Sequence, residues 1–291
     1  MKYAWIKRYR YRYSVKIMCK MLEVSPAGYY GWLHHVPSNR DRWREKLAEV
    51  IVKSFERSYQ IYGYRKVHQD LIQEYKVTCC KETVRRIMRA HFLRSKIKRG
   101  FIRTTDSTHE YKVADNILAG QFEVDRPDKV WVADITYIRT ASGWLYLSAI
   151  MDLYGRRIVG WSMSNRIDTK LVKDALGMAL LHRGKRTDLM HHSDQGSQYC
   201  SDMYQKDLEK NGITCSMSRK GNCWDNACME SFFGSLKSEW IADQRYASRK
   251  EAEKSIFFYI EMFYNRKRRH ESLGYVTPVE YEAQYEKDHV A

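Results

Sequence analysis

The spacing of apolar residues divides the chain into a helical front part and a mixed back part. Between residues 40 and 92 apolar side chains recur every three or four positions, which predicts three helices. The first helix is expected over about 40–57, the second after a turn at 62–66, and the third over about 81–89. From Val130 onward the apolar residues form short runs between turn residues, which indicates β-strands.

The back part has the element order of an α/β domain. Three strands joined by short turns are followed by alternating helices and strands. Strands are predicted at about 130–139, 144–151, 157–163, 189–193 and 213–218. Helices are predicted at about 169–182, 201–211, 226–240 and 249–264. Three antiparallel strands followed by α-β-α-β-α is the order of a ribonuclease-H-like α/β domain.

The first 34 residues show a weaker helical pattern. Val15, Met18 and Leu22 form one apolar stripe, and Ser25 with Pro26 is a typical start for a second short helix. Two such helices resemble a helix-turn-helix in shape, so reading of DNA is one interpretation. Any helical hairpin would give the same pattern, so a purely structural role is the other.

The third helix of residues 40–92 carries a basic stripe. Lys81, Arg85 and Arg89 recur every four residues, on the side opposite to the apolar residues. A basic outer face on the last helix of a three-helix unit suits insertion into a DNA major groove. We expect these three residues and Arg65 to contact DNA, although a solvated basic surface would have the same sequence.

The charge of the chain is concentrated at its front. Residues 1–104 contain 25 Lys and Arg against 8 Asp and Glu, a net charge of +17. The other 187 residues contain 26 against 27, a net charge of −1. This asymmetry favours a nucleic-acid-binding module attached to a neutral domain, with a solvated basic surface as the alternative.

Cysteine use and hydropathy indicate a cytoplasmic protein. The seven cysteines include no C-x-x-C pair, which predicts reduced thiols and argues against a zinc finger. The first residues lack the apolar segment of a signal peptide, and no apolar run approaches the length of a membrane span.

Three carboxylates stand out from this background. Asp134 interrupts an apolar strand, Asp194 follows a short strand, and Glu230 lies on a helix whose same face carries Asn226 and Lys237. Three hard oxygen ligands suit Mg²⁺ or Mn²⁺, and two such ions can promote phosphodiester displacement. Taken singly, each acid could equally be a turn or surface residue.

At these residues the sequence resembles the OrfB-type transposases of bacterial insertion sequences, which share a retroviral-integrase-like (DDE) catalytic core. The family signature has two Asp, a Glu after 35 intervening residues, and a basic residue seven positions later, as in Asp194, Glu230 and Lys237. The matching segments are 131–137 (WVADITY), 192–199 (HSDQGSQY) and 225–233 (DNACMESFF). Further matches are 62–65, 81–84, 143–147, 264–270 and 273–278.

The resemblance implies a ribonuclease-H-like integrase catalytic core preceded by an all-α, helix-turn-helix-like region. It implies that Asp134, Asp194 and Glu230 are catalytic and bind two Mg²⁺ or Mn²⁺ ions, and that Lys237 contacts DNA, as we also expect for Asn226. The implied activity is metal-dependent cleavage at the ends of an insertion sequence and transfer of the freed strand to a target. We expect a homo-oligomer on DNA, associated with the nucleoid. The upstream reading-frame product is a candidate fusion or partner.

Two other functions use the same features. A hydrolytic ribonuclease-H-like nuclease would need the same acids, and a DNA-binding regulator could carry an inactive core. The predicted domains are 1–37 (helical hairpin), 38–103 (three-helix DNA-binding region), 104–125 (connector), 126–245 (catalytic core) and 246–291 (C-terminal helix and basic tail).

Overall fold

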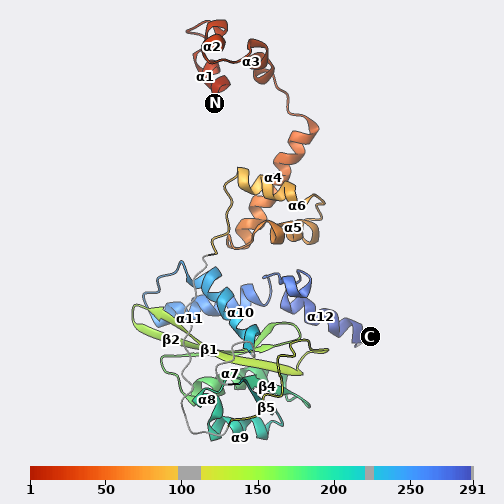
Figure 1. Cartoon of the computed structure of the whole chain (residues 1–291), viewed down its shortest axis with the longest axis vertical. Helices are drawn as coiled ribbons and strands as arrows, with labels where there is room; N and C mark the ends of the chain where they lie inside the picture. The colour runs from red at the N-terminus through yellow and green to blue at the C-terminus, as the bar shows by residue number, and fades with distance from the viewer. Residues whose placement is uncertain (98–112, 220–225, 290–291) are drawn as a thin grey trace.

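The computed structural model describes residues 1–97, 113–219 and 226–289, which form two helical units and an α/β part (Figure 1). The N-terminal unit consists of α1 (Lys2–Tyr9), α2 (Val15–Met21) and α3 (Pro26–Leu33). The three-helix unit consists of α4 (Asn39–Arg57), α5 (Tyr64–Gln73) and α6 (Lys81–Ala90). Helix α1 is absent from the sequence prediction because Ile6 is its one buried residue, too few for an apolar stripe.

The three predicted helices of the three-helix unit are confirmed. Helix α4 begins with a capping box, in which Ser38 and Asp41 bond each other's backbone N–H groups. The helices bury a shared apolar face made of Leu47, Ile51, Phe55, Val67, Leu71, Val84 and Met88. This packing fixes α6 with its charged side toward solvent.

A single five-stranded sheet forms the centre of the α/β part. Its strands are β1 (Val130–Thr140), β2 (Gly143–Asp152), β3 (Arg157–Ser164), β4 (Met190–Ser193) and β5 (Thr214–Met217). Their order in the sheet is β3-β2-β1-β4-β5. The first three strands are antiparallel, whereas β4 is parallel to β1 and β5 is parallel to β4. This topology confirms the predicted ribonuclease-H-like fold.

Helices cover both faces of this sheet (Figure 1). One face packs against α7 (Thr169–Arg183), α8 (Ser197–Cys200) and α9 (Asp202–Lys210). The other packs against α10 (Ala227–Ser235), η2 (Leu236–Ile241), α11 (Arg249–Phe257) and η3 (Phe258–Tyr264). The even-numbered residues of β1, including Asp134, share a face with Val132 and Ile138, so they lie on the α10 side.

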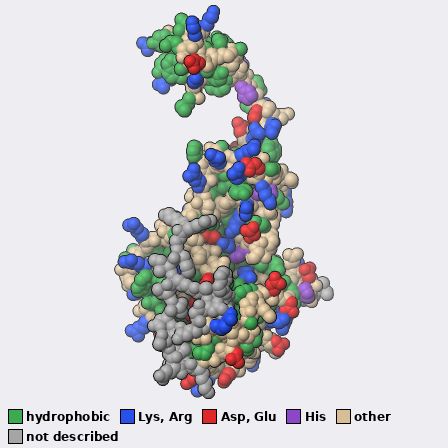
Figure 2. Space-filling model, viewed as in Figure 1, with side chains coloured by type: hydrophobic (Ala, Val, Ile, Leu, Met, Phe, Trp, Pro, Cys, Tyr) green, Lys and Arg blue, Asp and Glu red, His purple; other side chains and the backbone are tan. Residues whose placement is uncertain are grey.

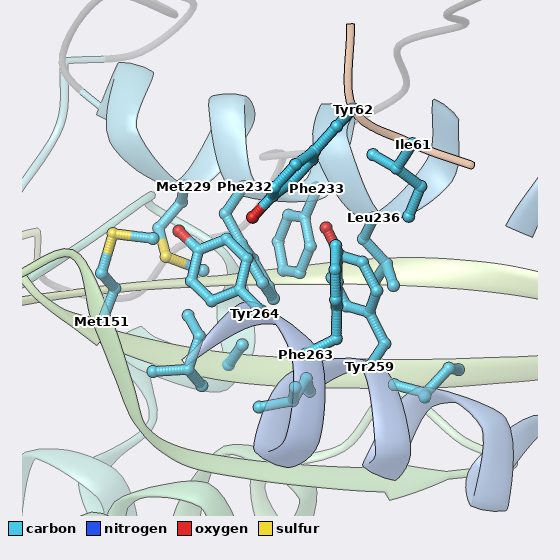
Figure 3. Close-up of a cluster of buried hydrophobic side chains, with 14 of the residues drawn as sticks. Ile61, Tyr62, Met151, Met229, Phe232, Phe233, Leu236, Tyr259, Phe263 and Tyr264 are labelled. Carbon is cyan, nitrogen blue, oxygen red and sulfur yellow. The ribbon is translucent and has the colours of Figure 1, made fainter. Parts of the chain in front are cut away.

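Aromatic side chains fill the core on the α10 side (Figure 3). Phe232 of α10 meets Tyr264 of η3 edge to face, with ring centroids 4.7 Å apart. Met229 of α10 and Met151 of β2 belong to the same buried cluster. These contacts hold α10, which carries Glu230, against the sheet.

Residues 265–289, expected to be a basic tail, contain η4 (Glu271–Leu273) and α12 (Pro278–His289). Helix α12 shows no clear apolar stripe because its buried residues are Pro278 and Glu282. Glu282 accepts hydrogen bonds from Arg157 and Arg183, each at 2.7 Å. Ion pairs, which a hydrophobic pattern does not reveal, therefore anchor this helix.

All six cysteines within the described residues are free, and Cys223 lies outside them. Among the helices of the described ranges, none is long and apolar enough to cross a membrane.

Candidate active site

The register of two parallel strands brings Asp134 and Asp194 together. Val132 of β1 pairs with His192 of β4, and β4 ends at Ser193. Continuing this register by two residues places Asp134 beside Asp194, at the edge where β4 stops. Neighbouring strands lie about 4.8 Å apart, so the two carboxylates share one small region.

The charges around Asp134 show which groups face it. Burial raises the pKa of Asp134 well above its ordinary value, and the negative charge of Asp194 raises it further. Glu230 also raises it, while the hydrogen bond from the Ile135 N–H to Oδ1 (2.7 Å) and the charge of Lys237 lower it. Two carboxylates and one ammonium group thus lie near enough to Asp134 for their charges to act on it.

A tight turn orients Asp194. Its Oδ1 accepts a hydrogen bond of 3.0 Å from the Gly196 N–H. A Cβ at residue 196 would lie 3.0 Å from that same oxygen and 2.9 Å from Oε1 of Gln198. Glycine therefore leaves room for the carboxylate to fold back onto the backbone.

Lys237 lies over an aromatic ring at the edge of this region. Its Nζ is 4.8 Å from the centroid of Tyr137, a cation–π distance. Burial lowers the pKa of Lys237, whereas Tyr137 and Asp134 raise it. Helix α10 continues directly into the π-helix η2, which carries Lys237 one to two turns after Glu230.

Asn226 does not suit the DNA contact predicted for it. The residue is 7% exposed, and its Nδ2 donates a hydrogen bond of 3.0 Å to the carbonyl of Ala133. This bond ties the start of α10 to β1 directly beside Asp134. The helical face inferred from residue spacing was wrong here because Asn226 precedes the helix and has non-helical backbone angles.

Sequence reasoning also missed Tyr199, which is buried behind the two aspartates. Burial raises the pKa of Tyr199, and the charges of Asp134 and Asp194 are among the further causes. Tyr199 follows Asp194 by five residues, on α8. A tyrosine at this spacing carries no distinct signal in one sequence.

The donor set fits a hard divalent cation in its chemistry. The charges of Asp194 and Glu230 raise the pKa of Asp134, which shows that they repel its carboxylate, and a cation between them would offset that repulsion. Within the described ranges, no three His, Cys, Asp or Glu side chains meet closely enough to hold a metal ion as they stand. To hold one ion together, Asp134, Asp194 and Glu230 would have to approach one another.

The predicted DNA-contact residues of the helical part lie at the surface. Lys81, Arg85 and Arg89 are exposed on α6, whose Val84 and Met88 are buried. Arg85 donates two hydrogen bonds of 2.8 Å to Glu82, so its charge is partly neutralised. Arg65 is also exposed, at the start of α5. The basic stretch 94–103 lies outside the described residues beyond position 97.

Family models match three regions of the chain. The model described as "Integrase core domain" matches residues 124–223, and a second model with the same description matches 211–278. A model described as "HTH-like domain" matches 42–101, which includes most of α4 and all of α5 and α6.

Curated relatives match nearly the whole chain. The "Insertion element IS600 uncharacterized 31 kDa protein" of Shigella sonnei is 43% identical over 92% of this chain and 98% of the relative. The "Transposase InsF for insertion sequence IS3A" of Escherichia coli K12 is 40% identical over 97% of this chain and 98% of the relative.

Solved structures include more distant neighbours. A chain from the intasome of simian T-cell lymphotropic virus, solved with the PP2A regulatory subunit B56 gamma, aligns with a TM-score of 0.47 and 14% identity. The alignment covers 80% of this chain and 74% of the viral chain.

Proposed function

The chain belongs to the IS3 family of insertion-sequence transposases, and from this membership we propose that Asp134, Asp194 and Glu230 are its catalytic, metal-binding residues. The protein is a DNA transposase with an integrase core, and its activity is that of a DDE polynucleotidyl transferase. The proposal is the assignment of this activity to Asp134, Asp194 and Glu230.

One observation carries this assignment. The pKa of Asp134 is raised by the charges of Asp194 and Glu230, which come from a different strand end and a different helix. Carboxylates kept together in a partly buried place cost stability unless a cation neutralises them. Clustered carboxylates that destabilise the fold in the absence of a cation are typical of metal-dependent catalytic sites.

The proposed ions are Mg²⁺ or Mn²⁺, two per site, held by the three carboxylates. When bound, they would activate the attacking oxygen and stabilise the leaving oxygen of an in-line phosphodiester displacement. The backbone N–H groups of Ile135 and Gly196 orient Asp134 and Asp194 for this task. Lys237 is half-buried beside Asp134 and is proposed to bind a DNA phosphate.

The helical part is proposed to hold the DNA. Lys81, Arg89 and Arg65 are exposed cations available to phosphates or base edges, and Arg85 would join them by leaving Glu82. We further propose that the protein acts as a homo-oligomer on element ends and target DNA in the bacterial cytoplasm, at the nucleoid. The upstream reading-frame product is a proposed fusion or partner.

We propose that the domains have the boundaries predicted from the sequence, and that the C-terminal segment 246–291 packs as part of the catalytic core. Tyr246, Ile256 and Phe263 belong to the same buried cluster as Val132 of β1. Residues beyond 245 therefore complete the core that supports the catalytic helix.

The test is a cleavage and joining assay on duplexes that carry the ends of the source element, with Mg²⁺ or Mn²⁺. Wild type is compared with Glu230→Gln and with Glu209→Gln, a matched change at an exposed residue of α9. We expect nicked and joined products from wild type and Glu209→Gln, and neither from Glu230→Gln. Nicking without joining would favour a nuclease. DNA binding without any metal-dependent product, also when the upstream product is fused, would favour a regulator.

A further inference from the structure

Helices α2 and α3 form a second helix-turn-helix, outside the region 42–101 that the HTH-like model matches. Four residues, 22–25, join them, and Glu23 adopts a left-handed conformation with φ of 54°. The Val24 N–H donates to the carbonyl of Cys19 at 3.0 Å, which closes the end of α2. This bond fixes the angle at which α3 leaves α2.

The N-terminal unit has a small core of its own. Met18 and Cys19 of α2, Tyr29 of α3 and Ile6 of α1 are buried together. Where α1 crosses α3, a Cβ at Gly28 would lie 2.5 Å from the hydroxyl oxygen of Tyr3, so glycine permits the close approach. The three helices therefore present α3 in a defined orientation.

The outer face of α3 suits a groove of duplex DNA. Ala27, Tyr30 and Gly31 are exposed there, and the eight residues of α3 include no charged side chain. Small residues allow the helix backbone to approach base edges, and alanine and aromatic groups can contact the thymine methyl group. The first turns of a recognition helix usually make these contacts.

The N-terminal unit is strongly basic. Residues 1–34 contain seven Lys and Arg and one Glu, a net charge of +6. Lys16 and Lys20 are exposed one turn apart on α2, the helix that crosses the DNA backbone in this motif. Lys and Arg side chains lie around the unit in Figure 2. Such charge complements phosphates and disfavours a basic protein partner.

The unit stands apart from the three-helix unit. Its buried cluster shares no residue with the other two core clusters of the described ranges. Residues 34–38, which lead to α4, are all exposed, and Figure 1 shows the two units separated along this segment. The unit can therefore reach a stretch of duplex that α6 does not occupy.

We propose that α2 and α3 bind duplex DNA as a second module, with Ala27 and Tyr30 at base edges and Lys16 and Lys20 at phosphates. One chain would then hold two segments of DNA, one with α3 and one with α6. This inference does not depend on the metal site, because binding is measured without divalent metal.

The test is hydroxyl-radical footprinting and anisotropy titration of the full chain, in EDTA, on duplexes carrying the source element's ends. Lys16→Glu/Lys20→Glu is compared with Lys206→Glu/Lys210→Glu, a pair of exposed lysines with the same spacing on α9. We expect the α2 pair to abolish one protected segment and leave the other. It should also lower the slope of log K against log salt by about 2. The α9 pair should change neither.

Tyr30→Ala separates base contact from charge. We expect it to weaken the same segment about tenfold or more without changing the salt slope. Footprints and salt slopes that are identical for wild type and all variants would overturn the proposal. So would an α2 pair that changes only the self-association measured by sedimentation.

Discussion

Arg269 and Asp70 form a buried ion pair that joins parts of the chain 199 residues apart, with Nε of the arginine 2.6 Å from Oδ1 of the aspartate. Their side chains are 3% and 10% exposed. Nearby, the hydroxyl of Tyr62 donates to the carbonyl of Lys267 at 2.6 Å. These bonds fasten the three-helix unit to the segment that follows η3, and so to the core beneath α10.

Arg269→Ala should destabilise the protein strongly. The change removes the arginine from the buried carboxylate of Asp70, which keeps the hydrogen bond from the Ser54 hydroxyl at 2.8 Å. Removing one partner of a buried pair costs about 3–5 kcal/mol, whereas a surface change stays within about 0.5 kcal/mol. Urea unfolding of Arg269→Ala and of the exposed control Arg266→Ala measures the difference. Equal stability of the two variants would contradict the structural role of the pair.

Gly160→Ala should also destabilise, through packing of α7 on β3. A Cβ at this residue would lie 2.3 Å from the carbonyl oxygen of Ala175 and 2.7 Å from Cβ of Ala179. The overpacking should cost about 1–3 kcal/mol or more.

Gly177→Ala is the matched control. Gly177 lies exposed on α7, the helix that packs against Gly160, and its added Cβ would have no atom within 4 Å. Helix propensity predicts that this variant gains up to about 1 kcal/mol. The two substitutions should shift the melting temperature in opposite directions, which thermal unfolding measures. A higher melting temperature for Gly160→Ala would refute the close contact.

Asp152 should make stability depend on pH. Burial raises the pKa of Asp152 to about 7, and the charges of Glu282 and Asp128 raise it while Arg183 and the Asp128 N–H lower it. An unfolded aspartate has a pKa near about 3.9, so the folded state favours the protonated form. Its contribution to stability is therefore complete below about pH 4 and is lost as pH rises through about 7.

Asp152→Asn removes this titration and retains Oδ1, which accepts from the Tyr154 N–H. The free energy of unfolding of this variant, relative to wild type, should rise between about pH 4 and 7 by up to about 4 kcal/mol and stay constant at higher pH. If the new amide group no longer accepts the hydrogen bond from the Asp128 N–H, the free energy lost is the same at every pH. Parallel stability curves for the two proteins would show that Asp152 keeps an ordinary pKa.

The basic stripe of α6 should contribute unequally to DNA binding. Arg89→Ala removes an exposed cation, and should weaken binding and lower the salt slope by about 1. Arg85→Ala should have a smaller effect because Arg85 is paired with Glu82. Anisotropy titrations at several salt concentrations measure both; a larger loss for Arg85→Ala would mean that this ion pair opens on DNA.

Much of the fold could be predicted because its elements carry their own patterns. Each of the three antiparallel strands is an apolar run between turn residues, which one sequence shows. The parallel pairing of β4 with β1, which brings Asp194 beside Asp134, joins distant segments and appears only in the structure. Asp152 ends β2 and accepts a hydrogen bond from the Tyr154 N–H, and its complete burial carries no signal in one sequence.

The missed features depend on contacts between distant segments. The run 266–269 looks like a basic tail, yet Arg268 is paired with Glu239 at 2.6 Å and Arg269 is buried against α5. Asn226 is directed by the carbonyl of Ala133, which lies 93 residues earlier. Patterns of charge along one segment do not show which opposite charge will meet them in space.

The central claim is that three carboxylates act as one unit in strand transfer. The most direct test measures single-turnover joining by Asp134→Asn, Asp194→Asn, Glu230→Gln and the triple variant, with Glu209→Gln as control. Residues that act together lose activity non-additively, so each single variant should fall to the same residual rate as the triple, at least about a hundredfold below wild type. A single variant that joins DNA at the wild-type rate would contradict the account.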